Sequence, residues 1–265
     1  MYAFAYHKPR SLAEAGELLA SHDEARLLAG GMTLLPALKL RLAAPTDLVD
    51  LGGLADLVGI TVSDSEIAIG AMTTHAAVTR NDAVATKIPA LATLAGGIGD
   101  PQVRHRGTIG GSLANNDPAA DYPAAALGLN AVIVTNKREI AADAYFKGLF
   151  ETALEENEII TKVKFPIPEK SGYEKFRNPA SRYAMVGVFV AKTASGVRVA
   201  VTGAGSSGVF RQAEMEAALS ANFAPDAIKG VEIDPNGLLS DLHGDAEYRA
   251  HLVGVIARRA VASAA

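Results

Sequence analysis

Two glycine pairs, each beside a hydroxyl side chain, are the residues of this chain best suited to binding an anion. One lies in residues 29–33 (AGGMT) and the other in residues 108–112 (TIGGS). Glycine permits positive φ angles and places no Cβ in the way of a ligand, so successive backbone N–H groups can converge on an anion. Two such turns, with the Thr and Ser hydroxyls as further donors, predict a site that holds a diphosphate from both sides.

These segments differ from the familiar nucleotide-binding motifs. The chain lacks the G-x-x-x-x-G-K-S/T string of a P-loop, and neither pair fits the G-x-G-x-x-G pattern of a Rossmann domain. A single glycine pair serves more often to reverse the chain than to bind phosphate. The pattern alone therefore leaves two interpretations open, a chain reversal and a phosphate site.

Composition excludes several other kinds of chemistry. The sequence contains no cysteine, so the chain forms no disulfide, offers no thiolate nucleophile and cannot by itself hold a cysteine-ligated iron–sulfur cluster. Its six histidines are scattered without H-E-x-x-H or similar spacing, and we predict no metal site. No G-x-S-x-G nucleophile elbow is present either. We predict no catalytic side chain in this chain.

His75 and the basic cluster at residues 104–106 each have a functional and a structural interpretation. His75 follows a predicted strand and could act as a base, but a lone histidine without an evident carboxylate partner is more often structural. The basic cluster could attract an anionic ligand or an acidic partner surface. A solvated loop is the interpretation we favour for it.

Charge and hydropathy indicate a soluble protein. The formal net charge is -4 and 49% of the residues are hydrophobic, so a sizeable core is expected. No basic stripe suggests a nucleic-acid partner, and no apolar run reaches the roughly 18 residues that a membrane span needs. The N-terminus lacks the basic start and apolar stretch of a signal peptide, so we expect a cytoplasmic protein without a membrane span.

Hydrophobic periodicity predicts an α+β fold. Ser11 and Glu14 have the spacing of a capping box, which predicts a helix over residues 11–20. Further helices are predicted over 34–41, 89–97, 123–129, 211–219 and 245–261. Strands are predicted over 25–29, 47–51, 66–71, 131–135, 138–141, 158–165, 173–177, 182–192 and 197–202.

A change of composition at residues 166–172 (PIPEKSG) predicts a linker. We therefore expect a first domain over residues 1–170, made of two α+β subdomains at about 1–57 and 58–170. Residues 171–265 form a second, smaller α+β domain.

Six stretches of the sequence resemble one family in the right order. They are AGGMTLLPALKLRL (29–42), IAIGAMTTHAAV (67–78), IGDPQVRHRGTIGGSLANNDPAADYPAAALGLNA (98–131), EII (158–160), YEKFRNPASRYAMVGV (173–188) and DLHGDAEYRAHL (241–252). The TIGGSLANNDPAAD segment is the most specific of them. The chain resembles the FAD-binding medium subunit of the molybdenum hydroxylase family, of the carbon monoxide dehydrogenase and xanthine dehydrogenase type.

The resemblance implies a fold and a setting. The fold is an FAD-binding domain of the vanillyl-alcohol-oxidase-like (PCMH) type, followed by a carbon monoxide dehydrogenase flavoprotein C-terminal domain. The setting is a complex with a large molybdopterin-binding subunit and a small subunit that holds two 2Fe–2S clusters, arranged as a dimer of heterotrimers. In that setting FAD, bound without a covalent link, passes electrons from the clusters to an external acceptor, and the lack of cysteine agrees because the clusters lie on a partner.

The resemblance also assigns roles to individual residues. The diphosphate of FAD is expected against the two glycine segments, and Asp121 is expected to accept hydrogen bonds from the cofactor. Tyr183 matches an aromatic position near the isoalloxazine, Arg177 a basic position near the flavin, and Leu51 and Ile160 apolar contacts. The full set of expected FAD-binding residues is Leu28, Ala29, Gly30, Gly31, Met32, Thr33, Leu34, Leu51, Thr108, Ile109, Gly110, Gly111, Ser112, Asn115, Asp121, Ile160, Arg177 and Tyr183.

Simpler interpretations of these residues remain. Asp121 could be the N-terminal residue of a helix before Pro123, and Leu51 and Ile160 could be plain core residues. For the whole chain, two other functions compete: a self-sufficient FAD-dependent oxidase of the related fold, and a nucleotide-binding module without redox activity. Only about 95 residues follow residue 170, which leaves little room for a substrate domain of an oxidase. The sequence leaves open the substrate of the complex and the final electron acceptor.

Overall fold

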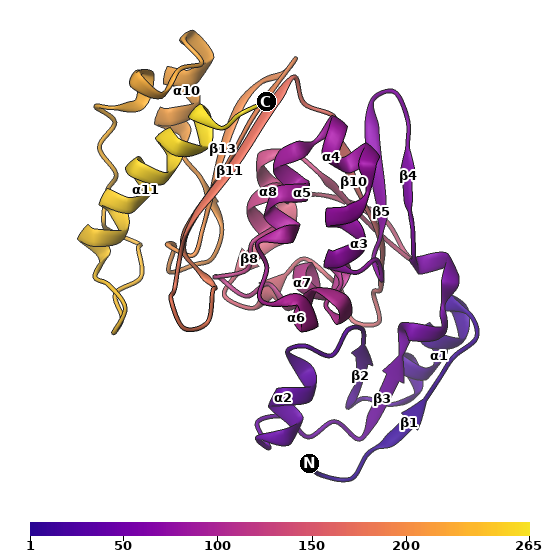
Figure 1. The fold of residues 1–265 in the computed structure, drawn as a ribbon. Helices are drawn as coiled ribbons and strands as arrows, with labels where there is room; N and C mark the ends of the chain where they lie inside the picture. Colours follow the sequence, from indigo (N-terminus) through magenta and orange to yellow (C-terminus); the bar gives the residue numbers. More distant parts are fainter.

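The computed structural model describes all 265 residues, and its strands form three main sheets. Figure 1 shows the N-terminal sheet, drawn in indigo and purple, beside a central region in which helices cover a larger sheet. The C-terminal sheet follows, with helices α10 and α11 on its far side. No helix of the chain has both the length and the apolar character that crossing a bilayer requires.

The N-terminal sheet is parallel, with strand order β1-β3-β2. Helix α1 begins as the capping box predicts, because Ser11 Oγ accepts a hydrogen bond from the Glu14 N–H at 3.1 Å. Its buried cluster of eight residues includes Met72 and Ile159, which join this part to the central region. Its elements are β1 (Ala5–His7), α1 (Leu12–Ser21), β2 (Ala25–Leu28), α2 (Leu34–Lys39), β3 (Asp47–Asp50) and short 3-10 turns at Leu51–Gly53 and Ala55–Leu57.

The central sheet is antiparallel, with strand order β4-β5-β10-β6-β7. The predicted hairpin is confirmed, since β6 and β7 pair antiparallel across a tight turn. The strands are β4 (Ile60–Val62), β5 (Glu66–Gly70), β6 (Val132–Thr135), β7 (Glu139–Ala141) and β10 (Ile160–Pro166), with a small pair of β8 (Phe146–Gly148) and β9 (Glu151–Thr152). The helices are α3 (His75–Arg80), α4 (Asp82–Lys87), α5 (Pro89–Gly96), α6 (Pro101–Arg106), α7 (Ile109–Asn115), α8 (Tyr122–Gly128) and α9 (Ala142–Tyr145).

The C-terminal sheet is covered on both faces. Along β12, Val188 and Val190 pack into the cluster that includes helix α11, whereas Phe189 and Ala191 pack into the cluster that includes helix α8. This alternation is the two-residue period of a strand that is buried on both sides. The elements are β11 (Lys170–Arg177), β12 (Ala184–Thr193), β13 (Gly196–Thr202), β14 (Phe210–Arg211), α10 (Ala213–Ala221), a 3-10 turn at Pro225–Ile228 and α11 (Ala246–Ala262).

Three expectations about the elements were wrong. The linker expected over 166–172 is only a three-residue connection, because β10 ends at Pro166 and β11 begins at Lys170. The strand expected over 182–192 begins two residues later, at Ala184. The loop expected at residues 104–106 is the last turn of helix α6, which Asp100 caps through its carboxylate and the Val103 N–H.

Candidate functional site

A cavity of about 1030 Å³ lies where the N-terminal sheet meets the central helices. Its walls include both glycine segments, the loop over residues 154–160 and the loop over residues 180–183. The volume is at the upper end of the range for small-molecule and cofactor sites. Most of the residues expected to bind FAD therefore converge on one space.

The first glycine segment leaves strand β2 and enters helix α2 with its backbone donors free. From Gly30 through Leu34, no backbone N–H donates a hydrogen bond to a protein acceptor. Gly31 has a φ of +73°, the left-handed conformation that glycine adopts without a Cβ penalty. Consecutive unpaired N–H groups around such a residue form a backbone nest, which is a binding geometry for anions.

The second glycine segment is not a turn with positive φ, and that expectation was wrong. Gly110 and Gly111 lie in the first turn of helix α7, which Thr108 caps by accepting the Gly111 N–H at 3.2 Å. The N–H groups of Ile109 and Gly110 donate to the carbonyls of Thr73 and Ala71. Since its backbone donors are used inside the protein, this segment offers the cavity mainly side-chain donors, from Ser112 and Asn115.

Glycine allows close backbone approach at both segments. A Cβ on Gly30 would meet the carbonyl oxygen of Arg106 at 2.0 Å, and one on Gly111 would lie 3.5 Å from the Cβ of Ala29. A Cβ on Gly110 would meet the Cβ of Ala71 at 2.6 Å. Close backbone approach, rather than backbone conformation, is thus the reason for glycine at positions 30 and 110.

Asp121 lies in the wall of the cavity as part of a buried network. Lys175 Nζ is 2.9 Å from its Oδ1, and the Tyr173 hydroxyl donates a hydrogen bond to the same oxygen. Burial raises the pKa of the Asp121 carboxyl, and the Lys175 ammonium opposes that rise. Asp121 stands at the N-terminus of helix α8, as the simpler interpretation expected, but its side chain accepts no hydrogen bond from the N–H groups of that helix.

Tyr183 lines the cavity from the loop before β12, not from the strand itself as expected. Its side chain is 48% exposed and forms no hydrogen bond through its hydroxyl. Burial, followed by the carboxylates of Asp117 and Asp121, raises the pKa of the phenol, which therefore stays neutral at neutral pH. A half-exposed neutral ring at the cavity wall is free to pack against a ligand.

Three of the expected residues do not line the cavity. The Ile109 side chain is fully buried in the central core, and Arg177 is exposed with its guanidinium against Gly97. Leu28 packs beside Gly31. The expected residues that do line it are Ala29, Gly30, Gly31, Met32, Thr33, Leu34, Leu51, Thr108, Gly110, Gly111, Ser112, Asn115, Asp121, Ile160 and Tyr183.

His75 also lines the cavity, as a buried side chain in the first turn of helix α3. Burial, and to a smaller extent the nearby Arg104 guanidinium, lowers the pKa of His75 to about 4. Its Nδ1 atom has no hydrogen-bond partner in the protein. The ring is therefore neutral at neutral pH, and no carboxylate is paired with it.

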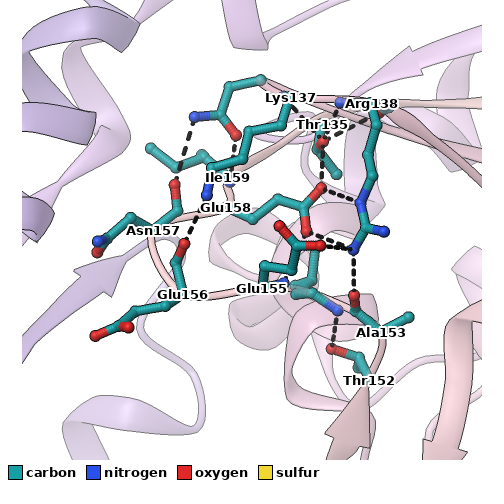
Figure 2. A network of polar contacts seen from close by, with 12 residues as sticks. Thr135, Lys137, Arg138, Thr152, Ala153, Glu155, Glu156, Asn157, Glu158 and Ile159 are labelled. Carbon is teal, nitrogen blue, oxygen red and sulfur yellow. Dashed lines mark hydrogen bonds and ion pairs between the residues drawn. The ribbon is translucent and has the colours of Figure 1, made fainter.

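A loop that contains none of the expected FAD-binding residues forms one edge of the cavity. The Arg138 guanidinium donates to both oxygens of the buried Glu158 at 3.0 and 3.1 Å, and also to the Ala153 carbonyl at 2.7 Å. Thr135 Oγ1 donates to Glu158 at 2.7 Å, and Lys137 Nζ donates to the Glu156 carbonyl at 2.8 Å. Figure 2 shows these contacts, by which the β6–β7 hairpin holds the loop over residues 153–159.

Hydrogen bonds determine the charge of Glu158, the buried member of an ion pair whose other member, Arg138, is 41% exposed. They lower the pKa of Glu158 to about 2, with Arg138 as the largest cause, so this carboxylate is charged at neutral pH. Glu155, Glu156, Asn157 and Glu158 all line the cavity. An acidic edge here and an N–H nest at Gly30–Leu34 give the cavity one side that accepts anions and one that repels them.

Comparison with known proteins agrees with this geometry. Residues 2–168 match the family described as FAD binding domain in molybdopterin dehydrogenase. The chain is 37% identical to the carbon monoxide dehydrogenase medium chain of Afipia carboxidovorans, over 98% of this chain and 96% of that one. It is 35% identical to the nicotine 6-hydroxylase medium subunit of Paenarthrobacter nicotinovorans, over 99% and 97%.

The chain belongs to the family of FAD-binding medium subunits of molybdenum hydroxylases. A solved structure of the carbon monoxide dehydrogenase from Hydrogenophaga pseudoflava superposes with a TM-score of 0.89 at 35% identity, covering 99% of this chain and 97% of that one. The expected fold class, an α+β FAD-binding domain followed by the flavoprotein C-terminal domain, is confirmed. As a medium subunit, the chain is a component of an oxidoreductase.

Proposed function

We propose that this chain is the electron-transfer subunit of a molybdopterin-dependent hydroxylase or dehydrogenase complex. It receives electrons from 2Fe–2S clusters on a partner subunit and passes them through one non-covalently bound FAD to an external acceptor. The observation that carries the proposal is the run of unpaired N–H groups from Gly30 through Leu34 at the wall of a cavity of about 1030 Å³. FAD supplies a ring system that accepts and releases electrons, and the protein holds and orients it.

The residues at the cavity fit the different parts of FAD. The diphosphate is anionic, so it belongs against the N–H nest at Gly30–Leu34, with the Ser112 hydroxyl as a donor from the second segment. A carboxylate accepts from hydroxyl or amino groups and repels phosphate, so Asp121 serves a part of the cofactor away from the diphosphate. Lys175 and Tyr173 hold that carboxylate in place.

The isoalloxazine belongs near Tyr183. This side chain is half exposed at the cavity wall, on the side formed by the C-terminal part of the chain. Leu51 and Ile160, both buried and both facing the cavity, add apolar contacts. Arg177 does not line the cavity. Its positive charge affects the site through Asp121, because it opposes the rise that burial causes in the pKa of that carboxyl.

The relatives and the composition support the proposed complex. The relatives are medium chains or subunits of dehydrogenases and hydroxylases, and the chain has no cysteine with which to hold clusters of its own. The partners are a large molybdopterin-binding subunit and a small 2Fe–2S subunit, in a cytoplasmic dimer of heterotrimers. Residues 1–170 form the FAD-binding domain, as subdomains 1–57 and 58–170, and residues 171–265 the C-terminal domain.

The cofactor content of the chain tests the proposal. Tag-free protein is purified, and FAD is measured by absorbance after denaturation. We expect a yellow protein with one FAD per chain and no substrate oxidation of its own. A colourless protein that fails to take up added FAD would contradict the proposal, and oxidation of a substrate by the isolated chain would favour a self-sufficient oxidase instead.

A further inference from the structure

Two histidines that are distant in the sequence meet one aspartate on the N-terminal sheet. His7 lies at the end of β1, His22 follows helix α1, and Asp47 begins β3. Their ligand atoms all lie within 4.8 Å of one another. His22 is 15 positions after His7 and Asp47 is 25 positions after His22, so the sequence shows no metal-ligand spacing.

The sheet register brings these side chains together. β1 and β2 both pair in parallel with β3, so Asp47 lies opposite Ala5 on one side and Ala25 on the other. His7 is two residues beyond Ala5 on the same face of β1. The His22 carbonyl accepts the Ala25 N–H at 2.9 Å, which fixes the second histidine at the start of β2.

The hydrogen bond of His22 leaves one nitrogen without a suitable partner. Its Nδ1 lies 2.9 Å from the Leu18 carbonyl, which only accepts, so Nδ1 carries a proton. In the neutral ring Nε2 is then a bare acceptor, and it lies 3.8 Å from Asp47 Oδ1, which is another acceptor. A positively charged species between these two atoms removes the repulsion.

We propose that His7, His22 and Asp47 bind a divalent transition-metal ion of the zinc class. In a tetrahedral zinc site, ligand atoms about 2.0–2.1 Å from the metal are roughly 3.3 Å from one another. The distances to Asp47 Oδ1, 2.6 Å from His7 Nε2 and 3.8 Å from His22 Nε2, lie on either side of that value. Small side-chain rotations therefore create the site, and the Leu18 carbonyl supplies the outer hydrogen bond that orients a ligating imidazole.

Exposure and charge at the cluster suit an exchangeable ion. The Asp47 side chain is 9% exposed, whereas those of His7 and His22 are 27% and 38% exposed, which leaves a path for an ion and a position for water. Asp47 supplies a carboxylate oxygen beside the two imidazoles, and both ligand types bind zinc. With three protein ligands, the site keeps an open coordination position.

The metal ion has a structural role in this arrangement. It links β1 and the end of helix α1 to β3, the middle strand of the N-terminal sheet. The buried cluster beside this sheet has only eight residues. The same strand pairs with β2, which leads directly into the N–H nest at Gly30–Leu34. Since His22 also lines the cavity, the ion stabilises one wall of it.

The test uses the tag-free full-length chain, treated with EDTA and exchanged into metal-free buffer. Zn²⁺ is added in a calorimetric titration, and thermal unfolding is recorded with and without the ion. We expect one Zn²⁺ per chain and a higher unfolding midpoint with Zn²⁺. His7→Gln and His22→Gln should each weaken Zn²⁺ binding by about tenfold or more and remove the rise in the midpoint.

His251→Gln is the matched control, because His251 is an exposed histidine on helix α11 outside the cluster. Its Zn²⁺ affinity should equal that of the unchanged chain. Far-ultraviolet circular dichroism checks that all three variants are folded. The proposal is wrong if the unchanged chain takes up no stoichiometric Zn²⁺, or if the folded His7 and His22 variants bind it as tightly as the control.

Discussion

Replacing Gly30 by alanine tests whether the first glycine segment must lie against the backbone of residues 106–107 for FAD to bind. The added Cβ would lie 2.0 Å from the Arg106 carbonyl oxygen and 2.9 Å from the Gly107 Cα, whereas real Cβ contacts are not found below 3.0 Å. The clashing atoms belong to the backbone, so no side chain can rotate away. The backbone at residue 30 must therefore move about 1 Å away from the backbone of residues 106–107.

The expected cost follows from that displacement. Overpacking of this kind destabilises a folded protein by typically 1–3 kcal/mol, and a backbone clash belongs at the upper end. A hydrogen bond to a charged group contributes about 1.5–3 kcal/mol, so losing one donor to the diphosphate weakens FAD binding by at least about tenfold. The predicted result is a folded chain that purifies with much less than one FAD.

Gly16→Ala is the matched control. Gly16 lies inside helix α1, and a Cβ there meets nothing within 4 Å. This variant should keep its FAD and gain roughly 0.5–1 kcal/mol of stability, because alanine favours a helix interior over glycine. FAD content and urea unfolding are measured for both variants, and a Gly30→Ala protein with a full complement of FAD and unchanged stability would refute this account of the contact.

Three further predictions concern the attachment, the environment and the support of the flavin. Acid precipitation should release all the yellow colour, since no covalent link is expected, and colour that remained in the precipitate would contradict this. Tyr183→Ala should retain FAD, because aromatic contact contributes only about 0.5–1.5 kcal/mol beyond area burial. The absorption bands of the bound FAD, and the rate at which an external acceptor reoxidises it, should change. An unchanged spectrum and rate would make Tyr183 a purely structural residue. Arg138→Met should lower the free energy of unfolding at pH 7, because the buried Glu158 carboxylate loses its ion-pair partner. The pKa of Glu158 is lowered to about 2, so the ion pair stabilises the unchanged protein above pH 4.5 and this stabilisation is lost as the pH falls towards 2. In urea titrations over that pH range, the variant should therefore lose less stability than the unchanged protein. Parallel curves of stability against pH would show that the pair contributes nothing.

Local signals predicted the elements that depend on neighbouring residues. The capping box at Ser11 and Glu14 marks the start of α1, and the two short strands around Asn136 form the expected hairpin. Helices α6 and α7 were missed although their N-caps, Asp100 and Thr108, are typical capping residues. Both helices have fewer than eight residues, which is too short for a hydrophobic period to be visible.

Most of the residues expected to bind FAD line the cavity, but the sequence did not indicate how they act. Glycine at positions 110 and 111 was expected to adopt positive φ, whereas the fold uses Gly110 for close contact with Ala71. The partners of Asp121, Tyr173 and Lys175, are 52 and 54 residues away in the chain. Such pairings follow from the packing of helix α8 against the C-terminal sheet, which no local pattern encodes.

The relay of electrons through FAD is tested most directly by removing the cofactor from the assembled complex. The complex is purified with its partner subunits, and a substrate that reduces its clusters is found among carbon monoxide, purines, aldehydes and N-heterocycles. After FAD is stripped, that substrate should still reduce the 2Fe–2S clusters under anaerobic conditions, but reduction of the external acceptor should stop and return when FAD is added. Continued reduction of the acceptor at the full rate without FAD would contradict the proposal that this chain is the relay.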